Sequence, residues 1–230
     1  MNSIVPRSRF GSWLPVSSYQ LLVTVCWLAV PVGTRLLVTR FIPGFHEYEA
    51  AFVYASDVVV LAVLAYGVWR CALRRSGVSY TRMFRAAVWV FLLAAAASVF
   101  VAVSKPLALY ALARLGLGIT LAFAVSALVR REPKAFTASL WALALAAAAE
   151  AVIAISQFMA QGAIGLRLLG ESPISAFDPA TSKVAAAGSA LVRAYGTFQH
   201  PNVLGAFLVL GLIAACALWL RIDWQPAIAA

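Results

Sequence analysis

The chain has 230 residues, of which 63% are hydrophobic and only 11% are charged, and its mean hydropathy is +0.91. A soluble domain of this size has about a quarter of its residues charged. The composition therefore excludes an ordinary soluble fold and predicts a protein that lies in the lipid bilayer. The 18 lysines and arginines against 8 acidic residues give a net charge of +10. Membrane topology explains such an excess, so we expect no nucleic-acid partner.

The sequence contains six apolar runs whose lengths are close to the roughly 20 residues that a spanning helix needs. The predicted spans are residues 19–38, 50–69, 86–104, 107–129, 135–160 and 203–220. The sequence thus predicts an all-α fold, a polytopic transmembrane helix bundle with residues 1–230 in a single transmembrane domain. Residues 161–201 are predicted as the long outer loop, in which the small-residue run 184–192 is compatible with a short helix at the membrane.

The basic residues orient these spans. Eleven of the 18 lysines and arginines fall in one set of alternate loops and six in the other, and Arg114 lies within the fourth span. Because basic loops stay on the cytoplasmic side, both termini are predicted to be cytoplasmic. The three cysteines, Cys26, Cys71 and Cys216, are odd in number and far apart, a pattern that indicates neither a disulfide framework nor a metal site. No metal or other cofactor is expected.

Three charged residues fall within the spans, where a charge is costly and rarely accidental. The orientation places Asp57, Arg114 and Glu150 at similar depth, below the outer surface. We expect Arg114 to pair with Asp57, Glu150 or both, because an unpaired buried charge costs far more. Two interpretations stay open: a structural ion pair that locks three helices, or the floor of an outward-facing polar cavity.

A second feature is the string RAYGTFQHPNVLGAFL, residues 193–208, at the end of the outer loop. Pro201 suits the first turn of the sixth helix, His200 would then flank it, and Gly196 permits a sharp turn before it. The N–H groups at such a helix start favour an anion, and Arg193 would add a planar phosphate binder. The alternative is an ordinary capped helix start with an interfacial arginine and tyrosine.

This string resembles the signature of the O-antigen ligase and O-antigen polymerase family, multipass bacterial membrane glycosyltransferases. The acid and the glutamine of the fifth span, Glu150 and Gln157, followed by a glycine-rich outer loop, resemble the family as well. The resemblance implies transfer of a glycan from undecaprenyl diphosphate to lipid A-core, a growing polysaccharide or a protein. In that family the reaction takes place at the periplasmic face of the inner membrane, and the resemblance implies that it needs no metal.

On these two lines of argument, the expected substrate-binding residues are Arg193, Gly196, His200, Asn202 and Arg114, and the expected structural residues are Asp57, Glu150, Phe198 and Pro201. The family's large outer loop with its catalytic histidine lies in the second half of such proteins. We therefore expect this chain to be the N-terminal portion of a larger membrane enzyme, inactive alone, and assign no catalytic residue. The alternative is a small multipass transporter or scaffold subunit without transferase activity.

The predicted orientation can be tested by single-cysteine labelling of intact cells, with the native cysteines replaced. A cysteine at Ser175 should react with a membrane-impermeant reagent, and a cysteine at Gly77 should react only after permeabilisation. The opposite pattern would overturn the orientation.

Overall fold

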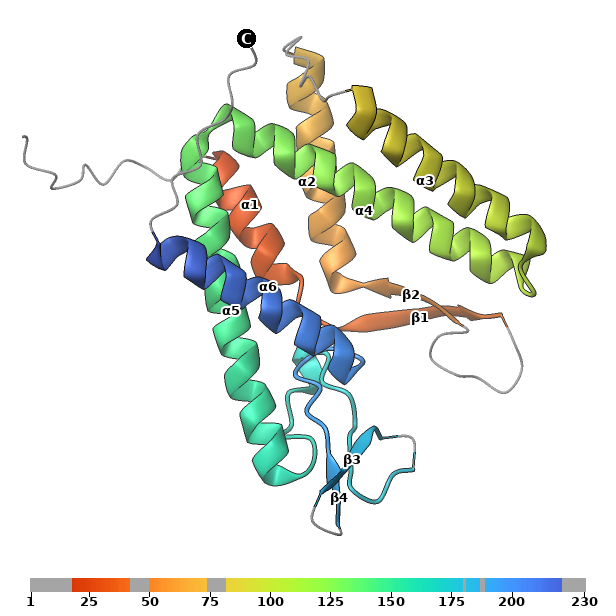
Figure 1. Cartoon of the computed structure of the whole chain (residues 1–230), viewed down its shortest axis with the longest axis vertical. Coiled ribbons are helices and arrows are strands. Elements are labelled where there is room, and N and C mark those ends of the chain that lie inside the picture. The colour runs from red at the N-terminus through yellow and green to blue at the C-terminus, as the bar shows by residue number, and fades with distance from the viewer. Residues whose placement is uncertain (1–17, 42–49, 74–81, 180, 187–188, 221–230) are drawn as a thin grey trace, which may run out of the picture.

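The structure, a computed structural model, describes residues 18–41, 50–73, 82–179, 181–186 and 189–220. Both termini, which the sequence predicts to be cytoplasmic, lie outside these residues. The described chain is mostly helical (Figure 1), with helices α1 (Ser18–Ala29), α2 (Ala55–Leu73), α3 (Arg82–Val101), α4 (Lys105–Arg131), α5 (Pro133–Ala160) and α6 (Pro201–Trp219). The described residues also include one 3-10 turn, η2 (Arg167–Leu169), in the loop between α5 and α6. Two short antiparallel hairpins complete the fold: β1 (Arg35–Arg40) with β2 (Ala50–Tyr54), and β3 (Lys183–Ala186) with β4 (Ser189–Val192).

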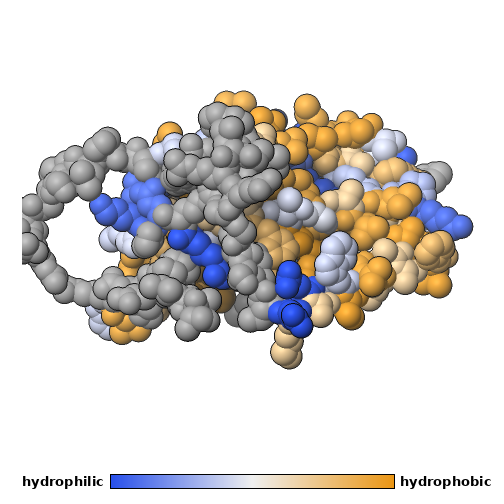
Figure 2. All heavy atoms as spheres, turned by 90° about the horizontal axis from the view of Figure 1, so that it is seen from above, coloured by the Kyte–Doolittle hydropathy of each residue, from blue (hydrophilic) through white to orange (hydrophobic). Residues whose placement is uncertain are grey.

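Four helices, α3, α4, α5 and α6, are long and apolar enough to cross a membrane. Their boundaries agree with the third to sixth predicted spans to within about four residues, so the prediction of a helical membrane protein holds at this level. Apolar side chains cover much of the described surface in Figure 2. In the first two predicted spans, the apolar helical stretches among the fully described residues are shorter, Gln20–Ala29 and Ala55–Tyr66, although α2 itself continues to Leu73.

The prediction of a helix over 19–38 is wrong in its second half. α1 ends at Ala29, because Pro31 lacks an amide hydrogen and disfavours helical backbone at the residue before it. The chain then turns and forms β1, which pairs with β2 from Arg35 opposite Tyr54 to Arg40 opposite Ala50. The second predicted span therefore also begins late, with a strand where its first five residues were expected to be helical.

The predicted short helix over 184–192 is also wrong. These residues contribute to β3 and β4, with Lys183 opposite Val192 and Ala186 opposite Ser189. A run of small residues has little side-chain periodicity to favour a helix, whereas a hairpin satisfies its backbone groups within the loop.

The helices do not run in one common direction. In Figure 1, α3, α4 and α6 run across the picture, whereas α1, α2 and α5 lie closer to its long axis. The main core forms where α6 crosses α5, and it contains Leu143, Ala146, Ala147, Leu204 and Phe207. At this crossing Gly211 of α6 faces Ala147 of α5 so closely that a side chain at 211 would collide with the Ala147 methyl group. Small residues thus let the two helices approach, as in many membrane bundles.

This close contact predicts that Gly211→Ala destabilises the protein. Overpacking of this kind typically costs about 1–3 kcal/mol, so the melting temperature of the purified chain in detergent should fall by several degrees. Gly205→Ala is the matched control, because it lies on the same helix and an added methyl group there meets no atom within 4 Å. Equal melting temperatures for the two variants would contradict the packing.

Candidate functional site

One buried side chain of α5, that of Gln157, fixes the segment before α6. The side chain of Gln157 is fully buried. Its Oε1 accepts hydrogen bonds from the backbone N–H groups of Tyr195 (3.0 Å) and Gly196 (2.8 Å). Its Nε2 donates to the Gly196 carbonyl (2.9 Å) and to Oε1 of Glu171 (2.9 Å). A glutamine amide has two donors and two acceptor positions, so Gln157 is fully occupied in holding this turn.

Glu150 of α5 fixes the next residue of this segment, Thr197. Its carboxylate is 3% exposed and accepts the backbone N–H of Thr197 at 3.0 Å and the Thr197 hydroxyl at 2.6 Å. The Thr197 hydroxyl also contacts the carbonyl of Pro31, beyond the end of α1. Gly196 has a φ of +62°, and a side chain there would collide with the Glu150 carboxylate. The glycine is therefore required both for the turn and for the approach to Glu150.

Glu171, for which the sequence predicted no role, completes this network from the loop between α5 and α6. Its buried carboxylate accepts the N–H groups of Ile164 (2.7 Å) and Leu166 (2.5 Å) as well as the amide of Gln157. Burial works to raise the pKa of Glu171, but these hydrogen bonds outweigh it and lower the pKa below its ordinary value. The carboxylate is thus favoured in its charged form, and its contribution to stability is lost only as the pH falls through the lowered pKa.

The start of α6 carries the residues predicted to bind substrate. α6 begins at Pro201, and His200 is its N-cap, with Nδ1 accepting the N–H of Asn202 at 3.1 Å. Nη2 of Arg193 donates to Oδ1 of Asn202 at 3.0 Å in an exposed contact. Phe198 is buried and packs against Phe207 of α6, with ring centroids 5.1 Å apart. The structure therefore brings Arg193, His200 and Asn202 together at one helix start.

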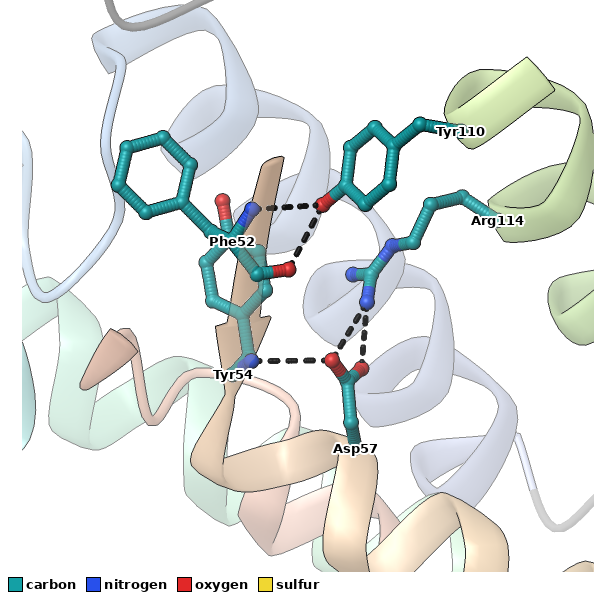
Figure 3. Close-up of polar contacts among 5 residues, drawn as sticks. All are labelled: Phe52, Tyr54, Asp57, Tyr110 and Arg114. Atoms are coloured by element: carbon teal, nitrogen blue, oxygen red, sulfur yellow. Dashed lines mark hydrogen bonds and ion pairs between the residues drawn. The ribbon is translucent and has the colours of Figure 1, made fainter. Parts of the chain in front are cut away.

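A separate polar network joins α2, β2 and α4 (Figure 3). Nη1 of Arg114 lies 2.6 Å from both carboxylate oxygens of Asp57, and its guanidinium carbon lies 5.0 Å from the centroid of the Tyr54 ring. Asp57 also accepts the Tyr54 N–H at 2.9 Å, which caps the first turn of α2. The Tyr110 hydroxyl, one turn before Arg114 on α4, donates to the Phe52 carbonyl (2.7 Å) and accepts its N–H (3.2 Å).

The charged residues that the sequence places at similar depth therefore divide between two networks. Arg114 pairs with Asp57, while Glu150 bonds Thr197. Asp57 and Arg114 fix the junction of β2 and α2 against α4, which is a structural task. Arg114 is a predicted substrate-binding residue, yet its described contacts lie in this network and not with Arg193 or Asn202. In the described residues, no group of three or more His, Cys, Asp or Glu side chains could hold a metal ion.

The comparisons with known proteins give no further guide to this site. No family model matches the chain, and neither a curated protein nor a solved structure matches it. Conclusions about the site therefore rest on its own geometry and chemistry.

The Asp57–Arg114 pair predicts that Arg114→Met lowers the yield of folded protein by leaving Asp57 unpaired. The Arg114 side chain is 37% exposed and that of Asp57 13%. The cost should therefore lie between the about 1 kcal/mol of exposed pairs and the about 3–5 kcal/mol of buried ones. Adding Asp57→Asn should recover part of the yield, measured as monodisperse protein in detergent.

Glu150→Gln combined with Arg114→Met is the matched control and should recover nothing, since Glu150 bonds Thr197 instead. Equal recovery from the two acid replacements, or recovery from neither, would show that Asp57 is not the specific partner of Arg114.

Proposed function

We propose that this chain forms the donor-binding part of a membrane glycosyltransferase of the O-antigen ligase and polymerase type. It would move a glycan from undecaprenyl diphosphate to lipid A-core, a growing polysaccharide or a protein at the periplasmic face of the bacterial inner membrane. The observation that supports this most is the hydrogen bond between Arg193 and Asn202 at the exposed start of α6. The backbone of the same segment is fixed by the buried Glu150 and Gln157.

This arrangement suits a diphosphate leaving group. The start of a helix attracts an anion by about 0.3–1 kcal/mol, and charge-assisted hydrogen bonds from Arg193 add about 1.5–3 kcal/mol. In neutral His200, an Nδ1 that accepts the Asn202 N–H leaves Nε2 as a donor that can reach a phosphate oxygen. Fixed donors of this kind stabilise the charge that develops as the sugar–phosphate bond breaks.

The proposal includes the finer membrane topology. Six spans, two cytoplasmic termini and an outer position for residues 161–201 would place the start of α6 at the periplasmic surface, where a lipid-linked donor is delivered. The support for this is the asymmetry of the lysines and arginines along the chain. The four long apolar helices are compatible with it.

One observation favours the alternative, a membrane transporter or scaffold subunit without transferase activity. Glu150 and Glu171 both have their carboxylate oxygens filled by hydrogen bonds from this chain. Neither acid is therefore placed to take a proton from an acceptor hydroxyl. In the transferase proposal that group comes from outside the described residues, and in the alternative no such group is needed.

The test is glycan transfer in cells by the full reading frame that carries this chain. Arg193→Ala should abolish transfer without lowering the amount of membrane-inserted protein. Arg193→Lys should restore it poorly, because a point charge cannot reproduce a bidentate guanidinium. Asn202→Ala should weaken transfer by a smaller factor, since it removes the partner of Arg193 but not the charge.

Lys183→Ala is the matched control, a basic residue of the same loop that lies on β3, and it should leave transfer unchanged. Normal transfer by Arg193→Ala would refute the assignment of the donor site. The absence of transfer by the native reading frame, with any donor and acceptor of the host, would favour the alternative.

A further inference from the structure

An apolar groove of about 380 Å³ lies between α4 and α5, and one side chain of α1, that of Trp27, forms part of its wall. Most of its lining is apolar, with Val129 of α4 and Leu143 of α5 as examples. The residues of the proposed donor site, Arg193, His200 and Asn202, do not line it. The inference drawn from this groove therefore does not depend on glycan transfer.

The groove exists because α4 and α5 diverge from a tight corner. α4 ends at Arg131 and α5 begins at Pro133, so a single residue joins the two helices. Figure 1 shows that they leave this corner in different directions. The Trp27 ring fills part of the wedge between them, since it packs against the core cluster that contains Leu143 and against the one that contains Leu128. The rest of the wedge is the groove.

The length and depth of the groove match one leaflet of a bilayer. Both helices are apolar enough to cross a membrane, and the charged residues at their corner, Arg130, Glu132 and Lys134, belong at its surface. The lining positions on α5 run from Phe136 to Leu143, about 10 Å along the helix. One leaflet contains about 15 Å of hydrocarbon, so the groove follows most of that depth from the surface inward.

The groove has a buried floor and an exposed rim. Val129 and Leu143 are each only 8% exposed, whereas Ala122 at the edge of the lining is exposed. It therefore opens onto a surface that meets hydrocarbon when the helices span a bilayer. The volume of about 380 Å³ is more than twice that of an apolar cavity of about 150 Å³ that admits benzene. A long, narrow, apolar space of this size suits one acyl chain.

Two serines lie in this apolar lining, and they differ in their hydrogen bonds. The buried Ser139 hydroxyl donates to the Ala135 carbonyl one turn earlier at 2.7 Å, so its donor is already used. Within the described residues the half-buried Ser126 hydroxyl forms no such bond, so it can donate to an oxygen atom in the groove. Ser126 lies four residues before Arg130 on α4, about 6 Å inside the charged corner.

We propose that this groove retains one acyl chain of a membrane phospholipid, with the chain against Trp27 and Leu143 and its ester carbonyl accepting the Ser126 hydroxyl. In a phospholipid the ester lies directly inside the phosphate, which is the depth of Ser126 relative to the charged corner. An unmodified hydrocarbon chain would leave this hydroxyl unpaired. Arg130 already has a partner within the chain, and no contact with the lipid is assigned to it.

The test uses the full chain with Trp27 as its only tryptophan, the other six replaced by phenylalanine, purified in detergent. Phosphatidylcholine with a dibrominated acyl chain is then titrated in, because bromine quenches indole fluorescence on contact. Quenching of Trp27 should saturate at a stoichiometric amount of lipid. A second chain whose only tryptophan is Trp141, which is 55% exposed and does not line the groove, should show gradual quenching without saturation.

Three variants of the single-tryptophan chain locate the lipid. Ala122→Phe fills the groove from its exposed rim and should remove the saturable phase. Ala113→Phe is the matched control, because it is an exposed position of the same helix that does not line the groove, and it should keep that phase. Ser126→Ala preserves the shape of the groove and should weaken the apparent affinity by about two- to tenfold, as the loss of one hydrogen bond implies.

Dibromostearic acid, a free fatty acid without an ester, should quench Trp27 more weakly, because its carboxylate would have to leave the membrane surface to reach Ser126. Gradual quenching of Trp27 in the native groove, or a saturable phase that survives Ala122→Phe, would overturn the site. Equal affinity of the native groove and Ser126→Ala, or tighter binding of the fatty acid, would overturn the assignment of the ester.

Discussion

The side-chain amide of Gln157 forms hydrogen bonds with the buried backbone before α6, which has no helix or strand partner. Tyr195, Gly196 and Thr197 lie buried between helices, where an unpaired backbone N–H or carbonyl costs free energy comparable to a lost hydrogen bond. Gln157 satisfies the first two amides and one carbonyl, and Glu150 satisfies the third amide. The irregular backbone before α6 can therefore pack against α5 without leaving these three amides unpaired.

The position of the other segments follows from this contact. Thr197, fixed by Glu150, also contacts the Pro31 carbonyl, and the chain after α1 therefore passes beside the loop between α5 and α6. That passage is possible only because Gly33 and Gly170 have no side chains. Glu171 then links the loop back to Gln157. Two polar residues of α5, Gln157 and Glu150, thus connect the start of α6, the loop before it and, through Thr197, the end of α1.

The helical character and the four long helices α3 to α6 were the predictable part, because an apolar run of about 20 residues has few alternatives in lipid. The start of α6 was readable from Pro201, whose missing amide suits a first turn. The sequence did not predict β1, since apolar residues such as Leu36 and Leu37 serve a spanning helix or a hairpin equally well. Nor did it predict the choice of Asp57 over Glu150 by Arg114, because residue depth along a helix says nothing about which face it occupies. Glu171 carried no local signal, since its partners are backbone amides that only the folded loop brings together.

The two polar networks meet at the first hairpin. Arg114 and Tyr110 of α4 fix β2, and Figure 3 shows the Phe52 ring turned away from them. On that ring lies Arg35, whose strand begins at the crossing held by Thr197. The carboxylates of Glu150 and Glu171 are both occupied by hydrogen bonds from the chain itself. Among the arginines near this site, Arg114 is engaged by Asp57, whereas Arg193 lies in an exposed contact with Asn202 at the start of α6.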